Sequence, residues 1–338
     1  ARILYNHLYF SALTAEQRAD VLAEEFYLKI IDHKNFNPRV VQEITSQEYL
    51  ALTDRPIRET IAAVLENPEI LWERPYREHI SAMGRMMMLA LFLNGRGVSV
   101  ENLKRSFVRV ARAMGLDPHP SEVEASFRST FKELEGSVLA LNFEMVNFAN
   151  PGLRDFLQSV VTTDKLVPVL RPEMETLKEI SELWAVFQAS KPVENEMNQS
   201  AASWVAALDR MHEGGHSDPY QYIELAADIC AKLNYAPLES RLQRAFDELE
   251  RDTFTDDDVA TVCSLLERSW GQSLSWELED RFRTVTTKIA AQLLVEFAEM
   301  MSFEDLQGLD EALHSYGNDT ELAREASHEV IQSIARNI

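Results

Sequence analysis

A chain of 338 residues accommodates two or three domains of ordinary size. Hydrophobic residues make up 46% and charged residues 26% of it, but 11 glycines and 12 prolines are too few for β-sandwiches, β-barrels or doubly wound α/β folds. The net charge is −22: residues 1–163 carry 18 basic and 21 acidic side chains, and residues 164–338 carry 15 and 34. The second half therefore disfavours nucleic acid and anionic lipid, and presents either a solvated helical surface or a face for a basic partner.

The first 74 residues are expected to form a small helical module. Thr14 and Gln17 make a capping box at the start of a helix that continues over the apolar pattern from Val21 to Ile30. Pro38 disfavours a helical conformation at the residue before it and suits the first turn of the next helix. A further helix is predicted over Arg58–Glu66.

Residues 75–163 follow the order of a winged-helix domain. Three helices are predicted over Arg77–Leu93, from a cap at Ser99 to Gly115, and from a cap at Ser121 to Leu134. The hydrophobic period then changes to alternation, which predicts a two-stranded hairpin with its turn about Asn142–Glu144. A helix that opens at Pro151 closes the region.

The third of these helices is the one that would read DNA. Two basic residues, Arg128 and Lys132, face four glutamates, Glu122, Glu124, Glu133 and Glu135, on and beside this helix. A net acidic helix is the wrong surface for phosphate. We therefore interpret the winged helix as a scaffold, and a DNA-binding regulator is the third-ranked function.

Residues 164–338 are expected to be helical throughout. The predicted helices are Glu173–Ser190, Val193–Met211, Pro219–Leu233, Leu238–Arg251, Asp256–Trp270, Trp276–Met301, Phe303–Tyr316 and Thr320–Ile334. Short connections favour antiparallel helix pairs and an α-solenoid-like array. No fixed period is evident, so the repeat type stays open.

Motifs for catalysis or metal binding are absent from the sequence, which has no P-loop, nucleophile elbow or zinc signature, so the chain itself is predicted not to be an enzyme. His212 and His216 stand four apart, but the glycines between them favour a loop over a metal site. Cys230 and Cys263 are expected to be buried thiols in a reduced, cytoplasmic protein. The methionines Met83, Met86, Met87 and Met88 are expected to be core side chains. No apolar run is long enough to cross a membrane.

Two stretches resemble a known family. Ile3–Ser11 with Ile30–Arg39, and Val146–Leu157, are similar to the region that follows the nucleotide-binding core in STAND NTPases, most closely to the prokaryotic branch found in antiviral defence. In that family a P-loop core precedes a helical lid, a winged helix and a helical-repeat sensor. The resemblance implies a mostly α fold with a lid at 1–74, a winged-helix domain with a small β-hairpin at 75–163, and an acidic sensor at 164–338.

The resemblance also implies a function. The chain is expected to be the regulatory and sensing part of a larger switch, without a cofactor of its own, while the full-length protein uses ATP or ADP with Mg²⁺. A protein ligand, such as a phage protein, would bind the array and trigger homo-oligomerisation, with no nucleic acid or membrane partner. The alternative is a stand-alone helical scaffold for protein–protein interaction.

Three residues are carried over from the family as nucleotide contacts of the intact protein. Pro38 and Arg39 match the helix start that the lid presents to the nucleotide, and an arginine suits phosphate oxygens. Asn150 stands where related switches place a histidine that touches the diphosphate. A purely structural helix start with a surface Arg39 is the alternative for the first pair. No catalytic residue and no metal ligand is expected.

Overall fold

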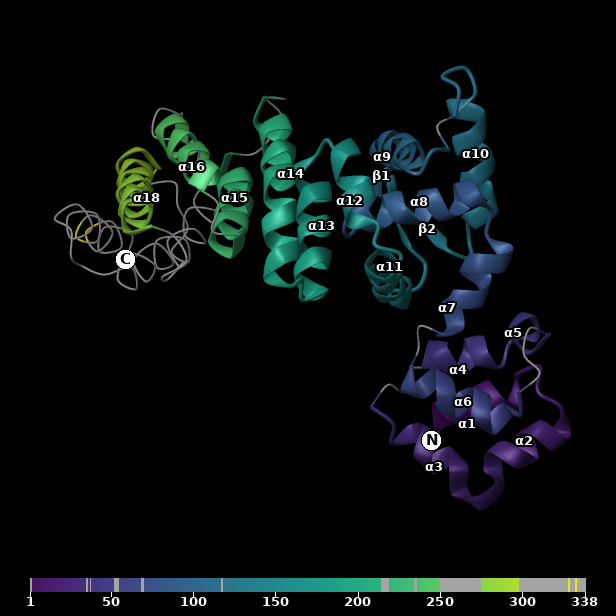
Figure 1. Cartoon of the computed structure of the whole chain (residues 1–338). Coiled ribbons are helices and arrows are strands. Elements are labelled where there is room, and N and C mark those ends of the chain that lie inside the picture. Colours follow the sequence, from purple (N-terminus) through teal and green to yellow (C-terminus); the bar gives the residue numbers. More distant parts are fainter. Residues whose placement is uncertain are drawn as a thin grey trace. The chain divides into compact units, whose positions relative to one another are not determined.

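The computed structural model describes residues 2–249 except 35, 37, 52–54, 68–69, 117, 214–218 and 234–235, together with residues 275–297, 328 and 332. This part of the chain is mostly helical and has one small antiparallel sheet, which confirms the predicted mostly α fold (Figure 1). Two compact units divide the chain, Ala1–Leu170 and Arg171–Ile338. The predicted lid and winged helix both belong to the first unit.

The first unit opens with the helices of the predicted lid. They are α1 (Arg2–Tyr9), α2 (Ala15–Leu22), the 3₁₀ turn η1 (Ala23–Glu25), α3 (Phe26–Ile31), α4 (Pro38–Ile44), α5 (Gln47–Ala51), α6 (Ile57–Glu66) and α7 (Ile70–Arg74). The capping box is confirmed, because the Gln17 amide donates to Thr14 Oγ1 at 3.2 Å and the Thr14 amide to Gln17 Oε1 at 2.8 Å. Pro38 begins α4 as predicted.

The continuous helix predicted through residues 21–30 is wrong. Glu24 and Glu25 have left-handed φ angles of 53° and 59° and separate α2 from α3. Val21 and Ile30 lie about two and a half turns apart in a continuous helix, which would place them on opposite faces. The break lets both side chains enter the lid core, where Val21 is 0% and Ile30 1% exposed.

The winged helix follows in the same unit. Its elements are η2 (Pro75–His79), α8 (Ala82–Leu93), β1 (Val98–Ser99), α9 (Val100–Ala113), α10 (Val123–Leu134), β2 (Leu139–Asn142), β3 (Met145–Phe148) and α11 (Gly152–Thr163). The predicted hairpin and its turn are confirmed, with Asn142 opposite Met145. β1 adds a strand that the sequence did not predict, so the sheet has the order β1-β3-β2. A two-residue strand is too short to show alternation.

Two predicted helix starts in this domain are wrong. The first helix begins at Ala82, because Ser81 Oγ accepts from the Gly84 amide at 2.9 Å and caps it there. Ser121 does not cap α10; its hydroxyl pairs with His119 Nδ1 at 2.8 Å, and Glu122 occupies the cap position without a side-chain bond. The core position of the methionines is confirmed for Met86–Met88, each at most 4% exposed.

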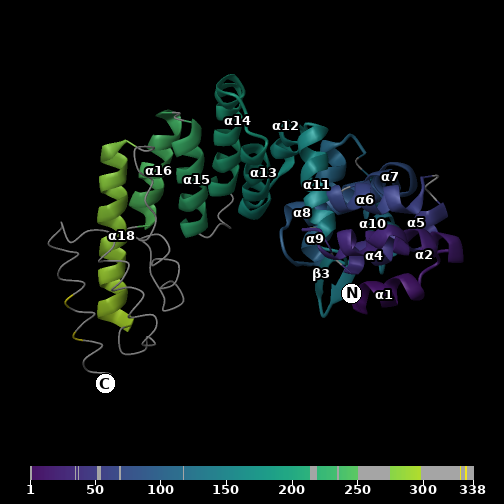
Figure 2. The same ribbon diagram turned by 90° about the horizontal axis from the view of Figure 1, so that it is seen from below.

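The described helices of the second unit form a row (Figure 2). After α12 (Val167–Leu170), which closes the first unit, come η3 (Arg171–Glu173), α13 (Leu177–Ala189), α14 (Glu194–Glu213), α15 (Pro219–Leu233), α16 (Ala236–Leu249) and α18 (Trp276–Phe297). The prediction for α15 is confirmed at both ends, whereas α13 starts later than predicted because Thr176 and Glu179 form a capping box. The predicted helices Asp256–Trp270, Phe303–Tyr316 and Thr320–Ile334 lie outside the described residues.

Alternate helices of the second unit begin at nearly equal intervals along the sequence. The helices α14, α16 and α18 begin at residues 194, 236 and 276, intervals of 42 and 40 residues. Arg241 of α16 donates to Asp209 of α14 at 2.8 Å, and Arg281 of α18 donates to Asp247 of α16 at 2.6 Å. An arginine–aspartate ion pair therefore joins α14 to α16, and another joins α16 to α18, as in a solenoid of stacked helical units.

Candidate functional site

The two predicted nucleotide contacts in the lid lie at the start of α4. Pro38 is its first residue, is half-buried, and has the fixed φ that suits a first helical turn. Arg39 follows in the same helix, and its side chain lies outside the described residues. The helix start that Pro38 predicts is thus present, and the contact of these residues with a nucleotide stays a prediction.

Asn150 lies far along the chain from these residues and has a local role at the start of α11. Its Oδ1 accepts a hydrogen bond from the Gly152 amide at 3.0 Å, and its carbonyl accepts from the Leu153 amide at 3.1 Å. This Asx turn satisfies amides that a helix N-terminus leaves unpaired. The side-chain oxygen of Asn150 is therefore already used within the winged helix.

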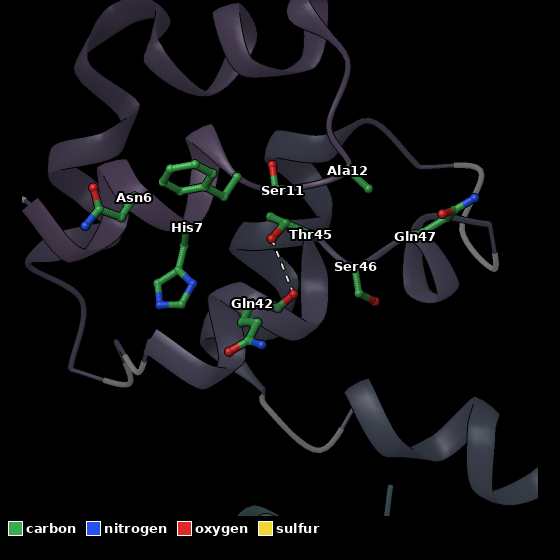
Figure 3. Close-up of a pocket in the computed structure, with 9 residues that line it drawn as sticks. Asn6, His7, Ser11, Ala12, Gln42, Thr45, Ser46 and Gln47 are labelled. Atoms are coloured by element: carbon green, nitrogen blue, oxygen red, sulfur yellow. Dashed lines mark hydrogen bonds between the residues drawn. The ribbon is translucent and has the colours of Figure 1, made fainter. Parts of the chain in front are cut away.

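A polar pocket lies beside α4 in the lid (Figure 3). It has a volume of about 510 Å³ and lies between the end of α1 and the C-terminal half of α4. The polar side chains that line it are Asn6, His7, Ser11, Gln42, Thr45, Ser46 and Gln47. The Ser11 and Thr45 hydroxyls donate to the backbone carbonyls of Leu8 and Val41, at 2.7 and 2.8 Å. The pocket offers hydrogen bonds but no carboxylate.

On the helix of the winged-helix domain that would meet DNA, Glu124 and Glu133 are bound by side chains of the same domain. Glu124 of α10 binds Arg128 at 3.1 Å and Lys104 of α9 at 3.4 Å. Glu133 accepts from both the amide and the hydroxyl of Ser81, at 2.8 and 2.7 Å. At the tip of the β2–β3 hairpin, hereafter the wing, Phe143 is fully exposed. An apolar wing tip lacks the basic groups that hold a phosphate backbone.

A groove with a volume of about 570 Å³ lies between α13 and α15 in the second unit. Its floor is apolar: Leu177, Trp184 and Leu225 line it and are at most 8% exposed. Carboxylates come from both helices, Glu182 from α13 and Glu224 and Asp228 from α15. The remaining lining residues are Lys178, Ser181, Ala185, Gln188 and Gln221. Three carboxylates and one ammonium group give the groove a net negative charge.

One carboxylate of the groove is held in place by neutral donors. Trp184 Nε1 and Gln188 Nε2 both donate to Oδ2 of Asp228, each at 2.6 Å. These bonds connect α13 to α15 and fix the Asp228 side chain at the groove wall. Since neither donor carries a charge, the pairing orients the carboxylate without neutralising it.

An aromatic cluster packs around Trp184, one of the residues that line the groove. The ring of Trp184 meets that of Trp204 edge-on at 5.0 Å and stacks on Phe187 at 5.6 Å. Arg171 lies over the Trp204 ring at 4.4 Å, and burial together with nearby Arg210 lowers the pKa of Arg171 to about 10. Tight packing of this kind holds Trp184 in one orientation.

Sequence reasoning did not find this groove. Trp184 and Asp228 stand 44 residues apart and belong to different helices. The only sequence signal is the spacing of Trp184 and Gln188, which share one helix face. His216 and the side chain of His212, for which the sequence favours a loop, lie outside the described residues, as does Cys263. Within the described part, no cluster of three or more His, Cys, Asp or Glu residues could hold a metal ion.

The chain matches no family model, no curated protein and no solved structure. None of the described helices is long and apolar enough to cross a membrane.

Proposed function

We propose that this chain is the regulatory and sensing part of a STAND-type ATPase switch that acts in the cytoplasm, in antiviral defence. The helical array of its second unit binds a protein ligand, and the lid and winged helix pass this event to a nucleotide-binding core. Oligomerisation of the full-length protein follows. The observation that carries the proposal is the groove between α13 and α15, a preformed surface on an array of stacked helices.

Element order supports the regulatory part of the proposal. The helices α1–α7 of the predicted lid are followed by three helices and a three-stranded sheet in winged-helix order, and then by an array of helices. Pro38 begins α4, which agrees with the helix start that the resemblance leads us to expect there. The paired charges of α10 and the apolar wing favour a scaffold over a DNA-binding regulator.

The product of the complete gene tests this function. We expect it to retain ADP through purification and to form a larger assembly when the ligand and ATP are present, with ADP holding the closed state. The present chain alone should neither bind nor hydrolyse ATP. A complete product that carries no nucleotide-binding core and no bound nucleotide would contradict the switch and favour the stand-alone scaffold.

Arg39 gives the sharper test in the complete protein. Arg39→Ala should weaken nucleotide binding about tenfold or more, because a charge-assisted phosphate contact is worth roughly 1.5–3 kcal/mol. Lys34→Ala removes the same charge from the exposed segment before α4 and is the matched control, with unchanged affinity expected. A lower melting temperature of Arg39→Ala with unchanged nucleotide affinity would leave Arg39 a purely structural role.

A further inference from the structure

We propose that the groove between α13 and α15 binds a segment of the partner protein that presents an arginine or lysine beside an apolar side chain. This inference rests on the proposed function and names the chemistry of its ligand. The groove combines what such a segment requires, an apolar floor made by Leu177, Trp184 and Leu225 and an acidic wall that includes Asp228. A long basic side chain can lay its methylene stem on the floor and direct its charged end to the wall.

The carboxylates of the second unit fall into two kinds, and this contrast points to the groove. Asp209 of α14 and Asp247 of α16 each bind an arginine of the helix two positions further along the array. These ion pairs connect α14 to α16 and α16 to α18. Asp228 of α15 also connects two helices, because it accepts hydrogen bonds from α13, but its donors there are the neutral side chains of Trp184 and Gln188. The array neutralises the first two carboxylates internally and leaves the charge of Asp228 for an external cation.

The position of Asp228 makes it suited to a cation from a protein. Its carboxylate is half-buried, so that a bound guanidinium would be partly shielded from water and the interaction strengthened. Both bonds end on Oδ2, so Oδ1 of Asp228 is the oxygen that can accept a new charge-assisted bond. Among the lining residues, all of which are described, Lys178 is the single base.

The charge of the whole second unit favours the same partner. Residues 171–338 carry 14 basic and 33 acidic side chains, so a basic surface is attracted over a distance and a nucleic acid is repelled. The groove makes the direct contact with the partner, and the net negative charge of the second unit attracts the basic partner over a longer distance.

Random dodecapeptides displayed on phage provide the test. They are selected against the whole chain, and the enriched sequences are synthesised as labelled peptides. We expect enrichment of arginine or lysine at a fixed distance from an apolar residue. Binding of these peptides should weaken severalfold when NaCl rises from about 50 to about 300 mM, because screening reduces the attraction.

Two variants of the same charge change locate the binding. Asp228→Asn keeps an oxygen for the Trp184 and Gln188 donors but loses the charge, so the melting temperature should change little while peptide affinity falls about tenfold. Glu194→Gln removes one charge from the exposed start of α14, which does not line the groove, and should leave affinity unchanged. Leu225→Ala, read only after its fold is verified, should also weaken binding by removing part of the floor.

The outcomes separate this inference from the proposed function. Enriched peptides without a basic residue, equal binding by the wild type and Asp228→Asn, or no enrichment at all would each overturn the inference about the groove. None of these results affects nucleotide retention or ligand-triggered assembly of the complete protein, which test the switch. A switch that assembles normally as Asp228→Asn would sense its ligand at another face of the array.

Discussion

A single strained residue shapes the tip of the wing. Phe143 has a φ of 55° and a fully exposed side chain. The left-handed conformation costs an ordinary L-residue roughly 1 kcal/mol or more, and no burial of the ring offsets this within the described part of the chain. The residue is therefore kept at the turn without a benefit to the stability of the winged helix.

We predict that Phe143→Gly stabilises the first unit by up to about 1 kcal/mol, because glycine adopts a positive φ without steric cost. Urea denaturation of the chain, followed by circular dichroism, measures the change. Phe143→Asn is the matched control and should give a smaller gain, since asparagine tolerates the left-handed region better than phenylalanine does. Destabilisation by both variants would mean that the phenyl ring packs against something in solution.

A buried thiol in α15 gives a prediction about pH. Burial, with a smaller effect of Glu239, raises the pKa of Cys230 from 9.0 to about 12. The folded thiol should resist alkylation by iodoacetamide at pH 8 and react once urea unfolds the second unit. Mass mapping of the modified peptide distinguishes Cys230 from Cys263.

The raised pKa of Cys230 also determines how the stability of the folded state changes with pH. The raised pKa means that the folded state prefers the neutral thiol, so its contribution is fully present below pH 9.0 and is lost as pH rises toward about 12. The stability of the wild type should therefore fall more steeply over this window than that of Cys230→Ala. Parallel pH profiles of the two proteins would show that the thiolate is accommodated in the fold.

At the scale of elements, variants of Asn150 at the start of α11 distinguish a structural role of this residue from a role in nucleotide binding. Asn150→Ala should destabilise the first unit by about 1 kcal/mol, because the Gly152 amide loses its acceptor. Asn150→Asp keeps the acceptor and places a negative charge at a helix N-terminus, so it should be neutral or slightly stabilising. Thermal unfolding of the chain measures both changes.

The same pair of variants tests the nucleotide contact in the complete protein. Asp at this position would repel a diphosphate, so Asn150→Asp should weaken ADP binding if Asn150 lies against the phosphates. Unchanged ADP affinity of a stably folded Asn150→Asp protein would restrict Asn150 to its role in the Asx turn.

Helix boundaries could be predicted where one local interaction decides them. The Thr14 capping box, the proline at the start of α4 and the bounds of α15 are of this kind. The predictions failed where tertiary packing competes with a local pattern. The break at Glu24 exists because Val21 and Ile30 both enter the core, and this requirement involves the whole lid.

The candidate site could be predicted much less well. A helix start at Pro38 follows from the sequence, because proline has a fixed conformation. The groove depends on bringing Trp184 next to Asp228, and this requires knowing that α13 packs beside α15 across an intervening helix. No local pattern contains that information, since the period of the array becomes evident only from the positions of the folded helices.

At the scale of the whole molecule, the two units differ sharply in charge. Residues 1–170 carry 19 basic and 22 acidic side chains, whereas residues 171–338 carry 14 and 33. Like charges on a folded surface repel each other, so the second unit loses stability at low ionic strength, while the first is nearly balanced. Inter-helix ion pairs such as Arg241–Asp209 offset only part of this repulsion.

We therefore predict that salt raises the unfolding temperature of the second unit and hardly changes that of the first. Four of the five tryptophans, Trp184, Trp204, Trp270 and Trp276, belong to the second unit, so tryptophan fluorescence reports mainly on its unfolding. Between about 20 and about 300 mM NaCl the fluorescence midpoint should rise by several degrees, because the distance over which surface charges repel each other falls from about 20 Å to about 6 Å. A residue 1–170 fragment, monitored by circular dichroism, is the comparison. Equal shifts for both would mean that surface repulsion does not distinguish the units.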